Sequence, residues 1–204
     1  MLIIENFYLR AGSDAILHVP NIHIPSGERA LLCANNATGK TQLLRAIRYP
    51  QPEFNGSIQL REPEGSKHKN NTCILLELAP HLLKDETVWQ NLVLPFKRIN
   101  DVQERKLFHY LKFVGMEDMT DRKIRSCSFA QMKLVELVRS LLIEPYLLLL
   151  DDLDKFFDKD RYEMCLRLLE HINASGCSVF ATSVQPLPGF NACFTVKDKE
   201  LIPC

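Results

Sequence analysis

The residues Gly39, Lys40 and Thr41 carry the clearest chemistry in this sequence of 204 residues. They follow a short apolar segment, residues 28–33, and precede residues 42–47, whose apolar side chains have helical spacing. A loop between a buried strand and a helix can surround a phosphate with backbone N–H groups, while a lysine reaches the terminal phosphates. The tripeptide alone is equally compatible with an ordinary strand-to-helix turn.

This loop departs from the usual phosphate-loop pattern G-x-x-x-x-G-K-[ST] at its first position, where Ala34 replaces glycine. Alanine tolerates most backbone conformations of glycine, but a positive φ there would cause strain. We expect Lys40 to pair with the β- and γ-phosphates and Thr41 to bind Mg²⁺. The residues expected to line the nucleotide are Asn36, Ala37, Thr38, Gly39, Lys40, Thr41 and Gln42.

Two adjacent acids, Asp151 and Asp152, follow four consecutive leucines at residues 147–150. Such a run is typical of a parallel strand covered on both faces, and open α/β sheets bind ligands at the C-terminal ends of these strands. An apolar run followed by acids is common on its own and usually structural. Together with the loop at Lys40, it predicts a nucleotide site in which Asp151 binds the same Mg²⁺ as Thr41.

The composition narrows the possible functions. The sequence has 25 Lys and Arg residues and 25 Asp and Glu residues, so no global charge attracts nucleic acid. Its seven cysteines form no C-x-x-C pair, which favours a reduced protein without a disulfide framework or zinc site. The start at Met1 lacks the features of a signal peptide, and no apolar run reaches membrane-spanning length.

The order of these motifs resembles the ATP-binding cassette (ABC) transporter family over residues 2–184. The segment at residues 81–95 is similar to the start of the helical subdomain in the FtsE, LolD and MacB branch. The remaining matching segments are residues 17–28 before the phosphate loop, residues 126–133 in the place of the signature motif, residues 153–158 in the place of the D-loop, and residues 178–183 as the last core strand.

The resemblance implies an α/β fold, a P-loop NTPase of ABC type with a mainly parallel core sheet flanked by helices. It adds an N-terminal antiparallel β-region and a helical subdomain. Residues 1–204 would form a single ABC ATPase domain, with core and β-region at residues 1–77 and 126–204 and the helical subdomain at residues 78–125. Local patterns predict three further elements: a hairpin and loop at residues 53–71, and helices at residues 102–114 and 162–172.

The resemblance also implies roles for individual residues. Asp152 would stand for the glutamate that polarises the attacking water, Ser183 for the switch histidine, and Tyr8 for the aromatic residue that stacks on adenine. Tyr8 is equally compatible with a packing or solvated tyrosine. The other implied residues are Ser128 and Gln131 of the signature motif, Asp158 of the D-loop, and Glu77, which replaces the Q-loop glutamine and is a candidate metal ligand.

Several of these positions depart from the family pattern, all at the γ-phosphate end. The carboxylate of Glu77 would repel phosphate, and Phe129, which with Ala130 replaces the two signature glycines, would obstruct the backbone's approach to it. Ser183 lacks a protonatable ring, and Asp152 is one methylene shorter than glutamate. These departures predict slow or absent hydrolysis. The alternative is an enzyme that tolerates them.

Two functional hypotheses remain. In the first, the chain is an ATP-binding subunit with attenuated hydrolysis that binds Mg²⁺ and ATP and acts on an FtsX-like or permease-like membrane subunit. In the second, it is a nucleotide-sensing or scaffolding pseudo-ATPase subunit without turnover, which could pair with an active subunit. In both, the resemblance implies a homodimer or heterodimer, a cytoplasmic position at the inner face of the membrane, and a docking groove near residues 78–97.

Overall fold

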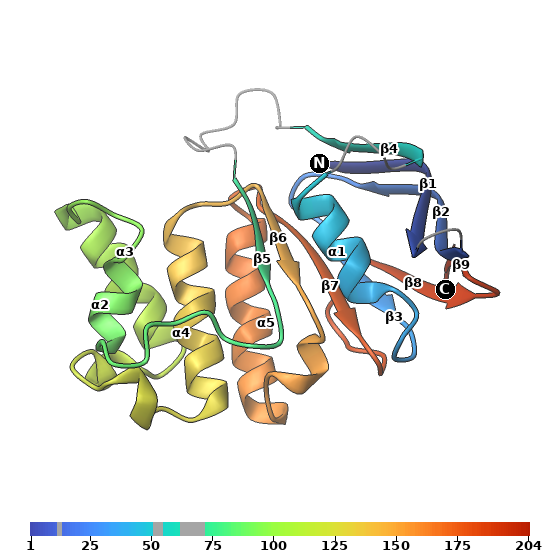
Figure 1. Ribbon diagram of the computed structural model, residues 1–204. Coiled ribbons are helices and arrows are strands. Elements are labelled where there is room, and N and C mark those ends of the chain that lie inside the picture. The colour runs from blue at the N-terminus through green and yellow to red at the C-terminus, as the bar shows by residue number, and fades with distance from the viewer. Residues whose placement is uncertain (12–13, 51–54, 62–71) are drawn as a thin grey trace.

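The computed structural model describes residues 1–11, 14–50, 55–61 and 72–204, and within these ranges one mixed sheet of nine strands forms the centre of the molecule (Figure 1). The strands are β1 (Leu2–Ala11), β2 (Asp14–Ile24), β3 (Arg29–Cys33), β4 (Asn55–Leu60), β5 (Cys73–Leu76), β6 (Leu147–Leu150), β7 (Ser178–Ser183), β8 (Ala192–Lys197) and β9 (Glu200–Pro203). Their order across the sheet is β4-β1-β2-β9-β8-β3-β7-β6-β5.

The sheet has a parallel core and an antiparallel region, as the sequence predicts. Strands β5, β6, β7, β3 and β8 run parallel, and the phosphate loop follows the central strand β3. Strands β1, β2 and β4 pair antiparallel. Strand β9 joins the two parts, since it pairs antiparallel with β8 and meets β2 at a single register position, His18 opposite Glu200.

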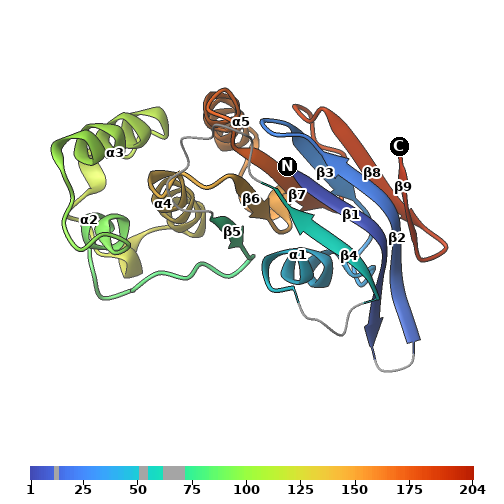
Figure 2. The same ribbon diagram turned by 90° about the horizontal axis from the view of Figure 1, so that it is seen from above.

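Helices cover both faces of the parallel core. The helices of the described ranges are α1 (Lys40–Arg48), α2 (Val88–Val93), α3 (Asp101–Phe113), α4 (Phe129–Leu142) and α5 (Lys159–Asn173), with one-turn 3-10 helices η1 (Glu117–Met119), η2 (Ile124–Ser126) and η3 (Leu153–Lys155). Helix α1 lies on one face, and α4 and α5 lie on the other (Figure 2). No helix in the described ranges combines the length and apolarity needed to span a bilayer.

The four leucines of β6 show how the sequence specifies this arrangement. Leu147 and Leu149 pack in the cluster that contains the α1 side chains and the β-region. Leu148 and Leu150 pack in the other cluster, which contains the apolar faces of α4 and α5. Because successive side chains of a strand point to opposite faces, a strand covered on both sides must be apolar throughout. The prediction of a doubly covered strand is confirmed.

The expected helices and strands around this core are largely present. Helices α3 and α5 confirm the predictions at residues 102–114 and 162–172, and both begin with an Asn or Asp cap, Asn100 and Asp158. Of the expected hairpin and loop at residues 53–71, residues 55–61 are described and include β4, and the rest lies outside the described residues. The division into a core and a helical subdomain at residues 78–125 stays a prediction.

Candidate phosphate-binding site

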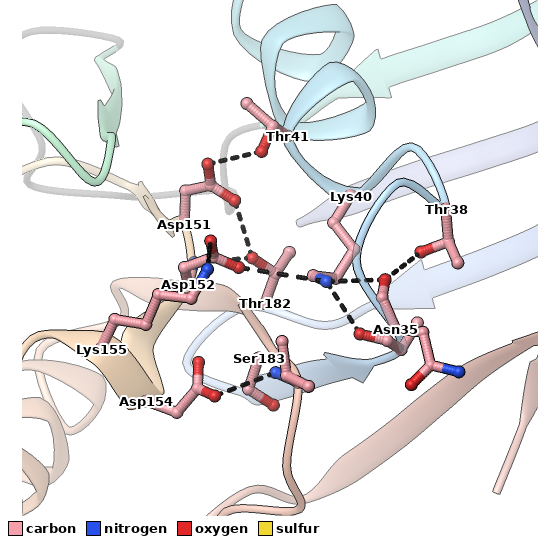
Figure 3. A network of polar contacts seen from close by, with 12 residues as sticks. Asn35, Thr38, Lys40, Thr41, Asp151, Asp152, Asp154, Lys155, Thr182 and Ser183 are labelled. Atoms are coloured by element: carbon pink, nitrogen blue, oxygen red, sulfur yellow. Dashed lines mark hydrogen bonds and ion pairs between the residues drawn. The ribbon is translucent and has the colours of Figure 1, made fainter.

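The loop between β3 and α1 curls around the ammonium group of Lys40, the first residue of α1. Lys40 Nζ donates hydrogen bonds to the backbone oxygens of Ala34, at 2.8 Å, and Asn35, at 3.0 Å (Figure 3). It also lies 4.0 Å from Asp152 Oδ1, and the side chain is 5% exposed. The loop therefore holds one buried cation at the N-terminus of a helix, which is an arrangement suited to an anion.

The backbone strain expected at Ala34 lies elsewhere in the loop. Ala34 is outside the positive-φ region, and its N–H donates to the oxygen of Ser183 at 3.1 Å. Ala37 instead has a φ of 61°, and Gly39, which caps α1, has a φ of 91°. A left-handed conformation strains alanine but costs glycine little. The loss of the first glycine is thus tolerated, and the strain falls on Ala37.

Thr41, Asp151 and Thr182 form a continuous network beside this loop. Thr41 Oγ1 donates to Asp151 Oδ2 at 2.7 Å, and Thr182 Oγ1 donates to Asp151 Oδ1 at 2.8 Å. Asp151 is 3% exposed, so both carboxylate oxygens are held in fixed directions. A carboxylate beside a hydroxyl offers the hard oxygen ligands that Mg²⁺ prefers.

A magnesium ion would need further ligands here. The described residues contain no cluster of three or more His, Cys, Asp or Glu side chains that could hold a metal. Phosphate oxygens of a bound nucleotide would complete the coordination, as is usual for Mg²⁺. The donor set of Thr41 and Asp151 therefore fits magnesium bound together with a polyphosphate.

A cavity of about 290 Å³ opens above the loop. It is lined by Asn36, Ala37, Gly39, Lys40, Thr41, Gln42 and Asp152. Thr38, whose hydroxyl donates to the oxygen of Asn35 at 2.9 Å, lines a neighbouring cavity of about 500 Å³ together with Ala37. The structure thus brings the predicted nucleotide residues around two adjoining cavities.

Asp152 lies at the edge of the smaller cavity, in a left-handed conformation with φ 50° and ψ 50°. Its N–H donates to Thr182 Oγ1 at 2.9 Å, and its Oδ2 accepts a hydrogen bond from Lys155 Nζ. That hydrogen bond raises the pKa of the Lys155 ammonium group. The predicted base is therefore already paired with a cation.

The predicted residues of the signature motif, the D-loop and the switch position have local partners. Ser128 caps α4 by accepting from the N–H of Gln131 at 3.2 Å, and the Gln131 side chain accepts from the N–H of Ser128 at 2.9 Å. Asp158 caps α5 by accepting from the N–H of Arg161 at 3.0 Å. Ser183 is fully buried, and its hydroxyl donates to the oxygen of Gln185 at 2.6 Å. All four residues thus stabilise their own chain segments.

Tyr8 and Glu77 also contact neighbouring side chains. The ring of Tyr8 stacks on His18, with ring centroids 4.2 Å apart and planes 9° apart. The carboxylate of Glu77 accepts from Arg45 Nε at 2.6 Å and lies 3.8 Å from His81 Nε2. Their roles as base-stacking residue and metal ligand stay predictions.

Three residues of this site were missed from the sequence, namely Thr182, Asp154 and Lys155. Asp154 Oδ2 accepts the N–H of Val184 at 3.1 Å, which joins η3 to the end of β7. The signal available for Lys155 was its position three residues after Asp152, a spacing that brings side chains together within a helical turn.

Helix α4 contains a buried ion pair. Lys133 and Glu136 of α4 are 0% and 2% exposed, with Nζ and Oε2 2.6 Å apart. Lys133 also donates to the backbone oxygen of Glu77 at 2.6 Å and lies 4.1 Å from the ring centroid of Phe156. Burial lowers the pKa of Lys133, and the carboxylate of Glu136 opposes that shift. The pair links α4 to the segments that follow β5 and β6.

Comparison with known proteins identifies the family. Residues 17–154, from β2 to η3, match the model of the ABC transporter family. The chain belongs to this family. The matched range includes the phosphate loop, residues 126–133 and the two acids after β6, whereas the roles of the individual residues stay predictions.

The curated relatives are longer than this chain. The methionine import ATP-binding protein MetN of Clostridioides difficile is 27% identical over 85% of this chain and 57% of its own length. The spermidine/putrescine import ATP-binding protein PotA of Spiroplasma citri is 31% identical over 74% of this chain and 45% of its own length. This chain therefore spans about half the length of these relatives.

Solved ABC structures share the fold. A cbiO subunit from Clostridium perfringens, part of the ABC transporter complex cbiONQ, superposes with a TM-score of 0.82 at 20% identity, covering 98% of this chain and 86% of its own. An ABC transporter cassette in its ADP conformation gives a TM-score of 0.79 at 20% identity, over 99% of this chain and 89% of its own. The predicted fold class is thereby confirmed.

Proposed function

We propose that this chain is the ATP-binding subunit of an ABC-type membrane complex, and that it binds Mg·ATP with attenuated hydrolysis. The observation that carries the proposal is the arrangement of Lys40, Thr41 and Asp151. A buried ammonium group faces the cavity at a helix N-terminus, and a hydroxyl and a carboxylate meet at 2.7 Å beside it. Together these groups supply the charges and oxygen ligands that a magnesium-bound triphosphate requires.

Slow hydrolysis is supported by the groups at the γ-phosphate end. Phosphoryl transfer depends on positioning and charge stabilisation, so each displaced group lowers the rate. Ser183 is buried and turned to Gln185, and Asp152 is paired with Lys155. Phe129, in the place of a signature glycine, is 40% exposed at the start of α4 and would crowd a nucleotide presented by a partner subunit.

A membrane subunit would dock between the core and the helices at residues 78–97. Leu78 and Leu83 are exposed there, at 38% and 50%, whereas Leu82 and Trp89 pack against the core. A cavity of about 430 Å³ adjoins this segment, between β5 and α4. The chain would then lie at the cytoplasmic face of the membrane, as a homodimer or as a heterodimer with an active partner.

Two cellular processes are candidates for the complex to which this chain would belong. The similarity of residues 81–95 to the FtsE branch favours an FtsEX-like complex in cell division, with an FtsX-like partner. The relatives named for methionine and spermidine/putrescine import favour an importer. A scaffolding pseudo-ATPase subunit remains the alternative if ATP binds without turnover.

Calorimetry with Mg·ATP tests the proposal directly. The native chain should bind nucleotide, and Lys40→Ala should weaken binding strongly because it removes the buried ammonium group. Lys112→Ala, a change in the last turn of α3, serves as a matched lysine control and should bind like the native chain. Absence of binding at millimolar Mg·ATP would reject the function.

A further inference from the structure

Both carboxylate oxygens of Asp152 face a lysine. Lys155 Nζ donates to Oδ2, and Lys40 Nζ lies 4.0 Å from Oδ1 (Figure 3). Asp152 is the acid in the position of the water-activating residue, and it also lines the phosphate cavity. A general base must direct a free carboxylate oxygen at the water it deprotonates. Here neither oxygen is without a cation nearby.

The backbone fixes the pair of Asp152 and Lys155 in place. The N–H of Lys155 donates to the oxygen of Asp152 at 2.9 Å, which closes the single turn of η3. The N–H of Asp152 is bound by Thr182 of β7. These two contacts fix the backbone positions of Asp152 and Lys155, which keeps the two side chains within reach of each other on one turn. The two side chains are 14% and 39% exposed, which leaves the lysine partly open to solvent.

A bound nucleotide would change the anionic partner of Lys40 but not that of Lys155. Lys40 lines the cavity and would turn its charge to phosphate when nucleotide enters. Lys155 does not line this cavity and would keep Asp152 as its partner. The carboxylate would therefore remain paired in the loaded site, with the charge of Lys155 opposing transfer of a water proton to it.

We propose that Lys155 is a positioning residue that restrains hydrolysis by holding the carboxylate of Asp152 away from the attacking water. This inference rests on the proposed function. In hydrolysis, the water oxygen bonds to the γ-phosphorus, the bond from that phosphorus to the bridging oxygen of ADP breaks, and the base accepts the water proton. Asp152 performs the last part of this step only when Lys155 releases it.

The test is steady-state Mg·ATP turnover by the full chain carrying Lys155→Ala or Lys155→Arg. Lys155→Ala should raise kcat on the order of tenfold and leave KM nearly unchanged, because a released base acts in the chemical step. Lys155→Arg keeps the cation and should keep the native kcat. In an Asp152→Asn background, Lys155→Ala should have no effect, since the lysine acts through that carboxylate.

Lys106→Ala provides the matched control. Lys106 is on α3, outside the phosphate site, and its Nζ lies 2.5 Å from Oε1 of Glu144. The change breaks this lysine–carboxylate pair and should leave turnover as in the native chain. If calorimetry shows that Lys155→Ala still binds nucleotide and its kcat is unchanged or lower, the inference is overturned while the proposed function stands. A rise that persists in the Asp152→Asn background would overturn it as well. Loss of Mg·ATP binding by the native chain would instead remove the proposed function on which it rests.

Discussion

Thr41 at the start of α1 donates a hydrogen bond of 2.7 Å to Asp151 at the end of β6, across 110 residues of sequence. This contact joins the phosphate loop to the end of β6, which β7 separates from β3 in the sheet, and the carboxylate is nearly buried. Since Thr182 holds the other carboxylate oxygen, the position of Asp151 is determined by two hydroxyl groups from two different elements.

Replacing Thr41 by valine should weaken Mg·ATP binding about 10- to 100-fold, because the hydroxyl both orients Asp151 and offers a ligand to magnesium. Binding of ATP without magnesium should change little. Thr41→Ser retains the hydroxyl and is the control. Calorimetry with and without Mg²⁺ measures the two affinities. An equal loss of affinity in the two conditions would show that Thr41 does not act through the metal.

Replacing Ala37 by glycine should stabilise the protein. The left-handed φ of 61° costs alanine about 1–2 kcal/mol, and the added freedom of glycine in the unfolded chain takes back about 0.4–1 kcal/mol. We expect a net gain of about 0.5–1 kcal/mol in the free energy of unfolding by urea. Ala34→Gly, at a position outside the positive-φ region, should have the opposite sign. Two changes of the same sign would contradict the assignment of strain to Ala37.

Lys133→Met should destabilise the fold by about 3–5 kcal/mol, because it leaves the buried carboxylate of Glu136 without its cation. Adding Glu136→Gln removes the unpaired charge and keeps an acceptor for the N–H of His81. The double variant should therefore be more stable than Lys133→Met alone. Urea unfolding of the native chain, the two single variants and the double variant gives the coupling, and simple additivity would argue against a coupled pair.

Stability should fall as the pH rises above 9. Burial raises the pKa of the Cys165 thiol to about 12, from an ordinary value of 9.0. Above pH 9 the unfolded chain loses this proton while the folded chain keeps it, so each pH unit removes up to about 1.4 kcal/mol. Burial also raises the pKa of the Cys73 and Cys177 thiols to about 12, so they add to the same loss of stability.

The variant Cys165→Ala isolates one of these thiols. The cavity left by the change should lower stability by a constant amount, whereas the pH slope between pH 9 and 10.5 should become shallower. Urea unfolding at several pH values compares the two slopes. Identical slopes would mean that the thiol of Cys165 does not keep its proton in the fold.

Much of the fold could be predicted because its signals are local. The four leucines at residues 147–150 specify a strand covered on both faces, and the residues around Lys40 specify a loop before a helix. The partners of the charged side chains could not be predicted in this way. Glu77 pairs with Arg45, 32 residues away, and this contact depends on how α1 packs against β5.

The details of the candidate site depend on features that spacing alone does not reveal. The sequence shows which glycines are missing from the loop, but the sign of φ at Ala34 and Ala37 follows from the path of the whole loop. The i,i+3 spacing of Lys133 and Glu136 is visible, whereas their burial depends on the packing of α4 against its neighbours. Thr182 has no motif of its own and becomes part of the site only because β7 lies beside β6.

The β-region joins the parallel core mainly through side-chain packing. In the part of the chain that the structure describes, a single register pair, the hydrogen bond from the N–H of His18 to the oxygen of Lys199 and the ion pair between His18 and Glu200 link β2 to β9, whereas the apolar side chains of β1 and β2 share one buried cluster with those of β3 and α1. The side chains of Leu9 and Ile16 lie where a Cβ on Gly39 would be only 3.1 Å from them. Because Gly39 has no side chain, Leu9 and Ile16 reach the backbone at the start of α1, so the β-region directly supports the end of the phosphate loop.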